Sequence, residues 1–178
     1  MQQLRIALIT TLALFFLAGA ALAGGKEDLI AAARTKDPQE GIRLATRAIA
    51  SGELTVRQKA MAYSNRSRDY LALKKYAQAV ADCNQALKIL PKYPEALQGR
   101  AMAYRNMGQY QKALDDLAAA ISLRPKYPRA YYTQATTYER MGKLDLAIAS
   151  AQKAVELSGG HPATKRLLQR LQQKRGAK

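Results

Sequence analysis

The chain repeats itself with a period of 34 residues, and this period decides what it can fold into. The tetrapeptide Pro-Lys-Tyr-Pro occurs at residues 91–94 and again at 125–128, and a further step of 34 places Pro162 in phase. When residues 60–93 are aligned with residues 94–127, ten positions are identical, whereas unrelated sequences would share about two. The tetrapeptide therefore marks the junction between repeated structural units.

Each period contains two segments with the hydrophobic spacing of an α-helix. Within residues 94–127, apolar residues recur every three or four positions on both sides of the sequence Met-Gly-Gln-Tyr, and the second run ends before Pro125. Gly108 and Gly142 occupy the place where the first helix ends and the chain reverses, a position suited to left-handed backbone. Prolines can begin each first helix, because a helix does not use its first amide hydrogens. The prolines in phase are Pro94, Pro128 and Pro162.

Small residues mark one face of each second helix. Alanines recur seven residues apart, at Ala79 and Ala86, Ala113 and Ala120, and Ala147 and Ala154. Side chains this small let helix backbones approach closely. Cys83, the only cysteine, falls on the same packing face, so we interpret it as a buried core thiol. With a single cysteine, no intramolecular disulfide is possible.

These features together resemble the tetratricopeptide repeat family, whose unit is a 34-residue antiparallel helix pair with small residues, a glycine-aromatic turn and a late proline in this order. The resemblance covers three units, residues 60–93, 94–127 and 128–161. It implies an all-α fold, a right-handed α-solenoid of antiparallel helix pairs. Lys74 replaces the first turn glycine, Leu144 the third turn aromatic, and Ser158–Gly160 the final proline. In left-handed backbone, Lys74 would carry roughly 1 kcal/mol of strain.

Two helical segments flank the three units. Residues 26–59 have the same character in a weaker phase, and we interpret them as a degenerate N-terminal helical repeat. Within this segment, Thr55 and Gln58 form a capping-box pattern for the next helix. Residues 162–178 place three leucines on one face of a basic helix, which is typical of a helix that caps the last repeat. The alternative is a basic amphipathic helix that lies on a membrane surface.

Residues 1–23 have the layout of a cleaved signal peptide. One positive charge at Arg5 precedes an apolar run that ends in the small-residue triplet Ala21-Leu22-Ala23. We therefore expect cleavage after Ala23 and an exported protein of bacterial type, periplasmic or secreted. The alternative is a membrane anchor formed by residues 6–23, because this stretch just reaches spanning length.

The charge balance is strongly basic. The chain has 29 Lys and Arg residues against 13 Asp and Glu residues, a formal net charge of +16. Such a surface attracts anions in a salt-dependent way. Outside the cytoplasm the anionic candidates are phospholipid headgroups, acidic polysaccharides and acidic protein segments, and the charge alone does not choose among them. Nucleic acid is disfavoured, because the tyrosines interleaved with the basic residues fall at repeat packing positions.

The residues needed for catalysis do not form a recognisable arrangement. The only histidine, His161, lies in the turn Ser-Gly-Gly-His-Pro, where no motif pairs it with a nucleophile. Asp115 and Asp116 are adjacent, but consecutive helix residues point about 100° apart and do not share a proton. The sequence has no phosphate-binding glycine loop and no metal-ligand cluster. We therefore expect no catalytic residues, no metal site, no cofactor and no enzymatic activity.

The family resemblance places the binding surface on the first helices. In such a solenoid the first helix of each pair lines a concave groove. The residues that this implies as partner-binding are Asn65, Arg68, Gln98, Met102, Arg105, Arg129, Tyr132, Thr136 and Arg140. Polar and basic groups with one aromatic suit an extended or helical peptide that carries carboxylates. Some chaperone adaptors of the family use a Lys/Asn clamp, but Ser64, Arg68 and Gly99 stand at the corresponding positions here, so that clamp is not matched.

Two functions are compatible with these features. The favoured one is a non-enzymatic adaptor or scaffold of the cell envelope that binds a protein or peptide partner, with acidic groups, in the groove. The alternative is a basic scaffold that binds an anionic polymer or lipid surface through distributed charge. A groove binder keeps affinity from packing, whereas a polyelectrolyte binder loses most of its affinity as salt rises. The sequence leaves the partner's identity and the oligomeric state open.

Overall fold

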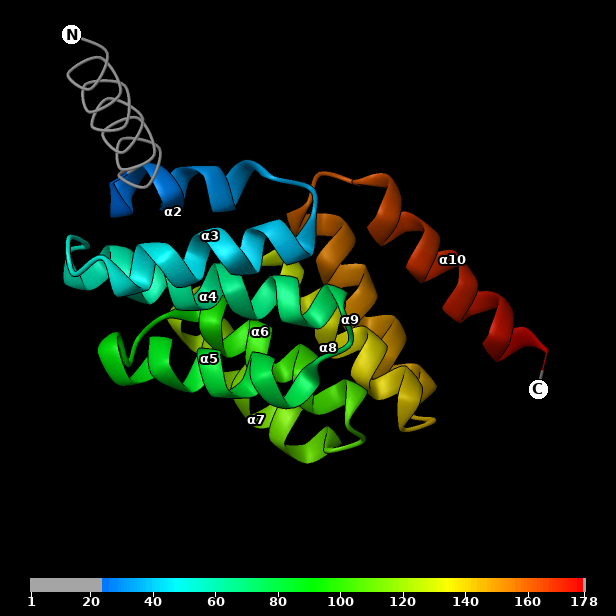
Figure 1. Cartoon of the computed structure of the whole chain (residues 1–178). Helices are drawn as coiled ribbons and strands as arrows, with labels where there is room; N and C mark the ends of the chain where they lie inside the picture. The colour runs from blue at the N-terminus through cyan, green and yellow to red at the C-terminus, as the bar shows by residue number, and fades with distance from the viewer. Residues whose placement is uncertain (1–23, 178) are drawn as a thin grey trace, which may run out of the picture.

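The computed structural model describes residues 24–177, which fold into nine α-helices and contain no strand (Figure 1). The helices are α2 (Gly25–Arg34), α3 (Pro38–Ala50), α4 (Val56–Ala72), α5 (Tyr76–Ile89), α6 (Pro94–Asn106), α7 (Tyr110–Leu123), α8 (Pro128–Arg140), α9 (Leu144–Leu157) and α10 (Pro162–Gly176). Consecutive helices pack as antiparallel pairs, so the all-α solenoid expected from the period is confirmed. The predicted signal peptide, residues 1–23, lies outside the described residues.

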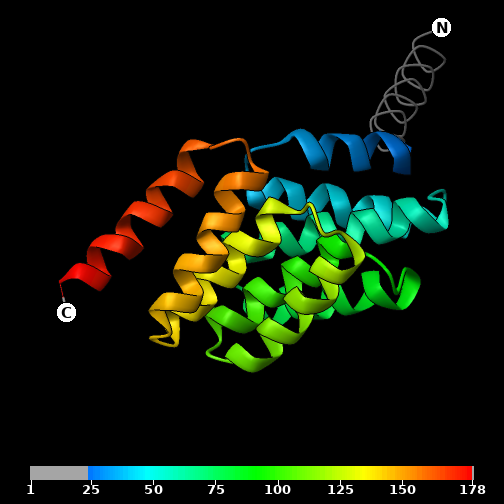
Figure 2. The same ribbon diagram turned by 180° about the vertical axis from the view of Figure 1, so that it is seen from behind.

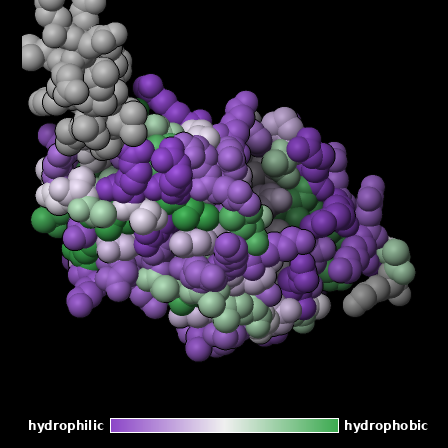
Figure 3. Space-filling model, in the orientation of Figure 1, coloured by the Kyte–Doolittle hydropathy of each residue, from purple (hydrophilic) through white to green (hydrophobic). Residues whose placement is uncertain are grey.

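The pairs stack in chain order, α2 with α3, α4 with α5, α6 with α7 and α8 with α9, and α10 packs alone on α9 (Figures 1 and 2). First helices also contact each other along the stack, α2 with α4, α4 with α6, and α6 with α8. Among residues 24–177, no helix is both long enough and apolar enough to cross a membrane. The face seen in Figure 3 is largely hydrophilic, with hydrophobic residues in separate patches.

The turns within the last three pairs, α4 with α5, α6 with α7 and α8 with α9, adopt left-handed backbone. Gly108 and Gly142 both have a φ of +75°, and Lys74 has a φ of +58° at the equivalent turn. Nothing lies within 4 Å of a Cβ built on either glycine, so the backbone angle and not lack of space favours glycine there. Lys74 therefore adopts the left-handed backbone on which the expected strain of roughly 1 kcal/mol depends.

The predicted helix starts are also confirmed. Pro94, Pro128 and Pro162 each occupy the first turn of their helices. Thr55 and Gln58 form a complete capping box, in which each residue's side chain accepts from the other's backbone N–H. Because of this cap, α4 begins at Val56, inside the segment assigned from sequence to the N-terminal repeat.

The core consists of alanines between helices and leucines at a few larger spaces. All six alanines predicted at seven-residue spacing are fully buried. Cys83 is fully buried as well, beside Gly99 and Ser67, and burial raises the pKa of its thiol to about 11. A thiol with this pKa stays protonated near neutral pH, so the interpretation as a core residue is confirmed.

The C-terminal helix completes the core of the last pair. Leu167 and Leu171 of α10 are 4% and 0% exposed, and they pack with Ile148 of α9 and Tyr132 of α8. This part of the core would face solvent without α10. The described part of α10 therefore covers apolar side chains of the last helix pair.

Buried ion pairs connect the helices across the stack. Nε and Nη2 of Arg66 donate to the two carboxylate oxygens of Asp82, and Arg100 makes the same forked pair with Asp116, with all four distances between 2.6 and 2.8 Å. The third nitrogen of each guanidinium donates to the preceding second helix, from Arg66 to Thr46 and from Arg100 to Asn84. Each arginine thus joins three helices.

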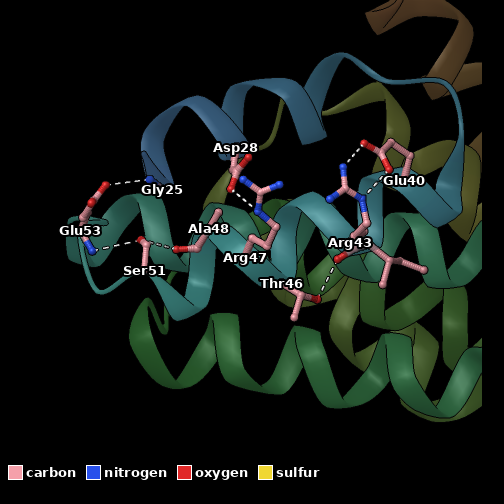
Figure 4. A network of polar contacts seen from close by, with 10 residues as sticks. Gly25, Asp28, Glu40, Arg43, Thr46, Arg47, Ala48, Ser51 and Glu53 are labelled. Carbon is pink, nitrogen blue, oxygen red and sulfur yellow. Dashed lines mark hydrogen bonds and ion pairs between the residues drawn. The ribbon is translucent and has the colours of Figure 1, made fainter. Parts of the chain in front are cut away.

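The N-terminal pair is held by its own polar contacts (Figure 4). Nε of Arg47 lies 3.0 Å from Oδ2 of Asp28, which connects α3 to α2. The backbone N–H of Gly25 donates to Oε2 of Glu53 at 2.7 Å, so the start of α2 is fixed to the loop before α4. These contacts hold α2 against α3 and against the loop that follows α3.

Candidate functional site

Three cavities follow one another along the first helices. The end cavity, of about 630 Å³, lies between α6, α8 and the α9–α10 turn. The middle cavity, of about 370 Å³, lies between α4 and α6, and the outer cavity, of about 580 Å³, lies at the start of α4 and the loop before α6. The end and middle cavities share Gln98, Met102 and Arg129, and the middle and outer cavities share Tyr93 and Glu95. The three cavities are therefore neighbours along the first helices, and together they are called the groove below.

The structure brings seven of the nine predicted partner-binding residues into this groove. Asn65 and Arg68 line the middle cavity, Arg105 and Tyr132 line the end cavity, and the other three are the residues that these two cavities share. Thr136 and Arg140 line none of the three cavities. Thr136 instead accepts a hydrogen bond from Arg105, and Arg140 is exposed.

One wall of the end cavity is missing from the prediction. It consists of Ser158, His161, Ala163 and Thr164, from the α9–α10 turn and the first turn of α10. The phase of Pro162 contained the signal, because it places α10 where the first helix of a further repeat would begin. His161 caps this helix: its Nδ1 accepts from the N–H of Ala163 at 3.3 Å. The residue interpreted as a plain turn histidine thus has a structural role at the groove.

The polar side chains in the floor of the end cavity are bonded to one another. Gln98 is 5% exposed, and its Nε2 donates to Oγ1 of Thr133 at 2.9 Å. Thr133 donates in turn to the backbone carbonyl of Arg129, also at 2.9 Å. Met102 and Tyr132 supply apolar surface beside them. The floor therefore offers mainly apolar contact to a ligand, because its polar groups already have partners.

Arg105 is the exception in this cavity. Its Nη1 donates to Oγ1 of Thr136 at 2.6 Å, and within residues 24–177 no carboxylate lies within 4 Å of its guanidinium. Burial lowers the pKa of Arg105, and the charge of Arg140 lowers it further. In contrast, the hydrogen bonds that Arg66 and Arg100 donate to Asp82 and Asp116 raise the pKa of these two arginines. Arg105 is thus a partly buried cation without a counter-charge.

The basic residues of α10 are partly neutralised by the last repeat. Arg170 lies 2.7 Å from Oε2 of Glu139 and Lys174 lies 3.7 Å from its Oε1, while Arg175 lies 3.5 Å from Oδ1 of Asp145. These contacts hold α10 against α8 and α9 from its polar side. They also leave less free charge on α10 than the sequence suggests.

Among the described residues, no three His, Cys, Asp or Glu side chains gather in a way that could hold a metal ion.

Sequence profiles described as tetratricopeptide repeat match residues 68–131 and 128–161. Comparison with curated proteins gave no match. The chain belongs to the tetratricopeptide repeat family. Repeats of this family are generally non-enzymatic modules that mediate protein–protein interaction.

Solved structures support the same assignment. The tetratricopeptide repeat domain of Sgt2 from Aspergillus fumigatus is 30% identical, with a TM-score of 0.61 over 65% of this chain and 78% of that chain. A thermophilic repeat protein of Thermus thermophilus is 21% identical, with a TM-score of 0.69 over 78% of this chain and 75% of that one. The second repeat domain of human RPAP3, solved with the HSP70 peptide SGPTIEEVD, is 22% identical, with a TM-score of 0.59 over 66% of this chain and 98% of that one.

Proposed function

We propose that the protein is a non-enzymatic adaptor or scaffold of the cell envelope that holds a peptide segment of a partner protein in the groove along α4, α6 and α8. The observation that carries this proposal is the row of three neighbouring cavities, which together offer apolar surface, two aromatic side chains and several arginines. A long groove of this kind suits an extended or helical peptide better than a compact small molecule.

Related proteins support a peptide as the partner. The second repeat domain of human RPAP3 was solved with a peptide whose C-terminal residues are mostly acidic. The groove described here also has an excess of basic over acidic side chains, with Arg68, Arg105 and Arg129 against Glu95. Glu95 is itself paired, since its Oε1 lies 2.7 Å from Nη1 of Arg124. A partner segment with carboxylates would complement this surface.

The proposed location in the envelope depends on residues 1–23. The apolar run and the triplet Ala21-Leu22-Ala23 support export by a cleaved signal peptide. The mature protein should then begin at Gly24. Mass spectrometry of the protein recovered from its native envelope tests this, and a chain that still begins at Met1 and needs detergent for extraction would support an anchor instead.

A pull-down from envelope extract tests the adaptor function. The double variant Tyr132→Ala/Arg105→Ala should keep its helical content and lose the partner, because Tyr and Arg side chains often dominate an interface. The control is Lys165→Ala/Arg166→Ala, which removes two exposed charges from α10 that form no ion pair among the described residues, leaves the Arg170–Glu139 pair in place and should retain the partner. Each variant is compared at low and high salt. Loss of binding by the α10 variant alone, together with strong salt sensitivity, would instead support binding to an anionic surface.

A further inference from the structure

The end cavity has uncompensated positive charge at its mouth. Arg105 and Arg129 line it, and its lining contains no acidic side chain. The acidic residue of α8, Glu139, does not line the cavity and is paired with Arg170 and Lys174 of α10. The docked α10 also supplies one wall of the cavity, through Ala163 and Thr164.

The body of the same cavity is apolar. Met102, Pro128, Tyr132 and Ala163 form its apolar lining, and the buried amide of Gln98 is already bonded within the floor. Its volume of about 630 Å³ lies in the range of specific ligand pockets, roughly 300–1,000 Å³. An occupant therefore needs an apolar part that replaces water over this floor, and an anionic part that reaches the guanidinium groups.

Arg105 is the group that can select for the anion. Its hydrogen bonds run from Nη1 to Thr136 and, at 3.5 Å, from Nη2 to Asn106, so it keeps further N–H donors for a ligand. Burial has already removed part of its water and lowers its pKa. A carboxylate at this point would restore the lost stabilisation with a charge-assisted, forked pair, as Asp116 does for Arg100.

We propose that the end cavity is the specificity pocket of the groove, and that it takes one bulky apolar side chain of a peptide in which an adjacent residue is Asp or Glu, with that carboxylate paired to Arg105. This inference rests on the proposed function, because it assumes that a peptide occupies the groove. The cavity shares Gln98, Met102 and Arg129 with the middle cavity, so a bound peptide can continue out of the pocket along α4 and α6.

Selection from a peptide library tests this chemistry while the natural partner is still unidentified. The probe is a library of random dodecapeptides displayed with their C-termini fused to the phage coat, which excludes recognition of a terminal carboxylate. The protein that begins at Gly24 is immobilised as the bait. We expect enrichment of peptides in which Phe, Leu, Ile, Met or Tyr neighbours Asp or Glu.

Affinity measurements then locate the contact. One selected peptide is synthesised with both ends blocked and a fluorophore attached, together with versions carrying Glu→Gln or a replacement of the apolar residue by Ala. For the unmodified protein, we expect Glu→Gln to weaken binding roughly tenfold or more, the size typical of a hydrogen-bonded charge pair. Arg105→Gln should bind both peptides alike, and Arg105→Lys should fall between, because lysine keeps the charge without the fork. Arg43→Gln, on the outer helix α3, should leave both affinities unchanged.

The outcomes distinguish failure of the pocket from failure of the groove. Peptides that bind in the groove but tolerate Glu→Gln, or an Arg105→Gln protein that still discriminates between the two peptides, overturn the specificity pocket and leave the adaptor function standing. If Tyr132→Ala and Met102→Ala leave the affinity for the selected peptides unchanged, the proposal that peptides bind in the groove is overturned. Dodecanoate that binds as tightly as the selected peptide overturns the choice of a peptide as occupant. Thermal unfolding of each variant shows whether the fold is retained.

Discussion

Asp69 of α4 is a carboxylate held where α3 and α4 pack together. Its side chain is 12% exposed, and its Oδ2 is buried with no hydrogen-bond partner among the described residues. Gly41 of α3 leaves room for it, because a Cβ at that position would overlap Oδ2. Burial raises the pKa of Asp69 to about 6, although Arg68, 3.9 Å away, acts in the opposite direction. The carboxylate is thus a local source of instability at neutral pH.

We predict that Asp69→Asn stabilises the protein at pH 7.5 and not at pH 3.5. Between the ordinary pKa of 3.8 and the folded-state pKa of about 6, the unfolded chain releases this proton first, so the free energy of unfolding falls as pH rises through that window. Above this window the charged carboxylate lowers the free energy of unfolding by about 3 kcal/mol. Thermal unfolding followed by circular dichroism across this pH range measures it. Asp115→Asn, at an exposed position, is the control, and a pH-independent difference between the Asp69 variant and the parent protein would contradict the assignment.

At the scale of elements, the helices follow from local signals in the sequence. The proline starts, the left-handed turns and the seven-residue alanine spacing each depend on a few neighbouring residues, and each was found where the pattern placed it. The paired arginines and aspartates were visible only as identities in the alignment. Their pairing across 16 residues depends on the rotation of two helices about their axes, which sequence spacing does not specify.

The candidate site was likewise predictable only in part, because its residue positions follow from the repeat pattern whereas their pairing depends on the packed helices. The family resemblance identifies which face of a first helix points into the groove, so residues such as Met102 and Tyr132 could be named. Whether a neighbouring side chain is free or already paired depends on the three-dimensional arrangement. Thr136, for example, is occupied by Arg105, and Gln98 by Thr133. For the wall contributed by α10, the phase of Pro162 indicates where the helix begins, but which of its side chains line the cavity depends on how the helix docks.

We predict that Asp116→Asn destabilises the protein by about 3 kcal/mol, because it leaves Arg100 partly buried without its counter-charge between α6 and α7. Asp115→Asn is a matched control on the adjacent residue, which is exposed and should change stability by less than about 0.5 kcal/mol. Urea unfolding measures both. Replacement of both partners, Arg100→Met with Asp116→Leu, should recover much of the loss. Equal effects of the two Asp→Asn changes would show that the pair does not hold these helices together.

At the scale of the whole molecule, each helix pair contacts mainly its neighbours in the chain. In a solenoid of this kind, stability is roughly the sum of terms from each repeat and its neighbours, so a destabilising substitution at one end should affect mainly the helices near it. The last pair differs from the others because α10 is its only outer neighbour among the described helices. The groove also ends there, at the wall that α10 forms. The stability of α10 and the shape of the end cavity are therefore coupled.

We predict that Leu171→Ala loosens this end of the molecule alone. Leu171 is fully buried against the last pair, and its truncation should cost about 2–5 kcal/mol of local packing. Amide hydrogen exchange should therefore accelerate in α8, α9 and α10 while α2, α3 and α4 keep the exchange rates of the parent protein. Gln172→Ala, at the exposed neighbouring position, is the control and should change none of these rates. A helix that normally detaches to lie on an anionic surface would exchange rapidly already in the parent protein, and Leu171→Ala would then leave α8 and α9 unaffected. Faster exchange in the last pair would instead link the docking of α10 directly to the order of the cavity wall at which a partner peptide would end.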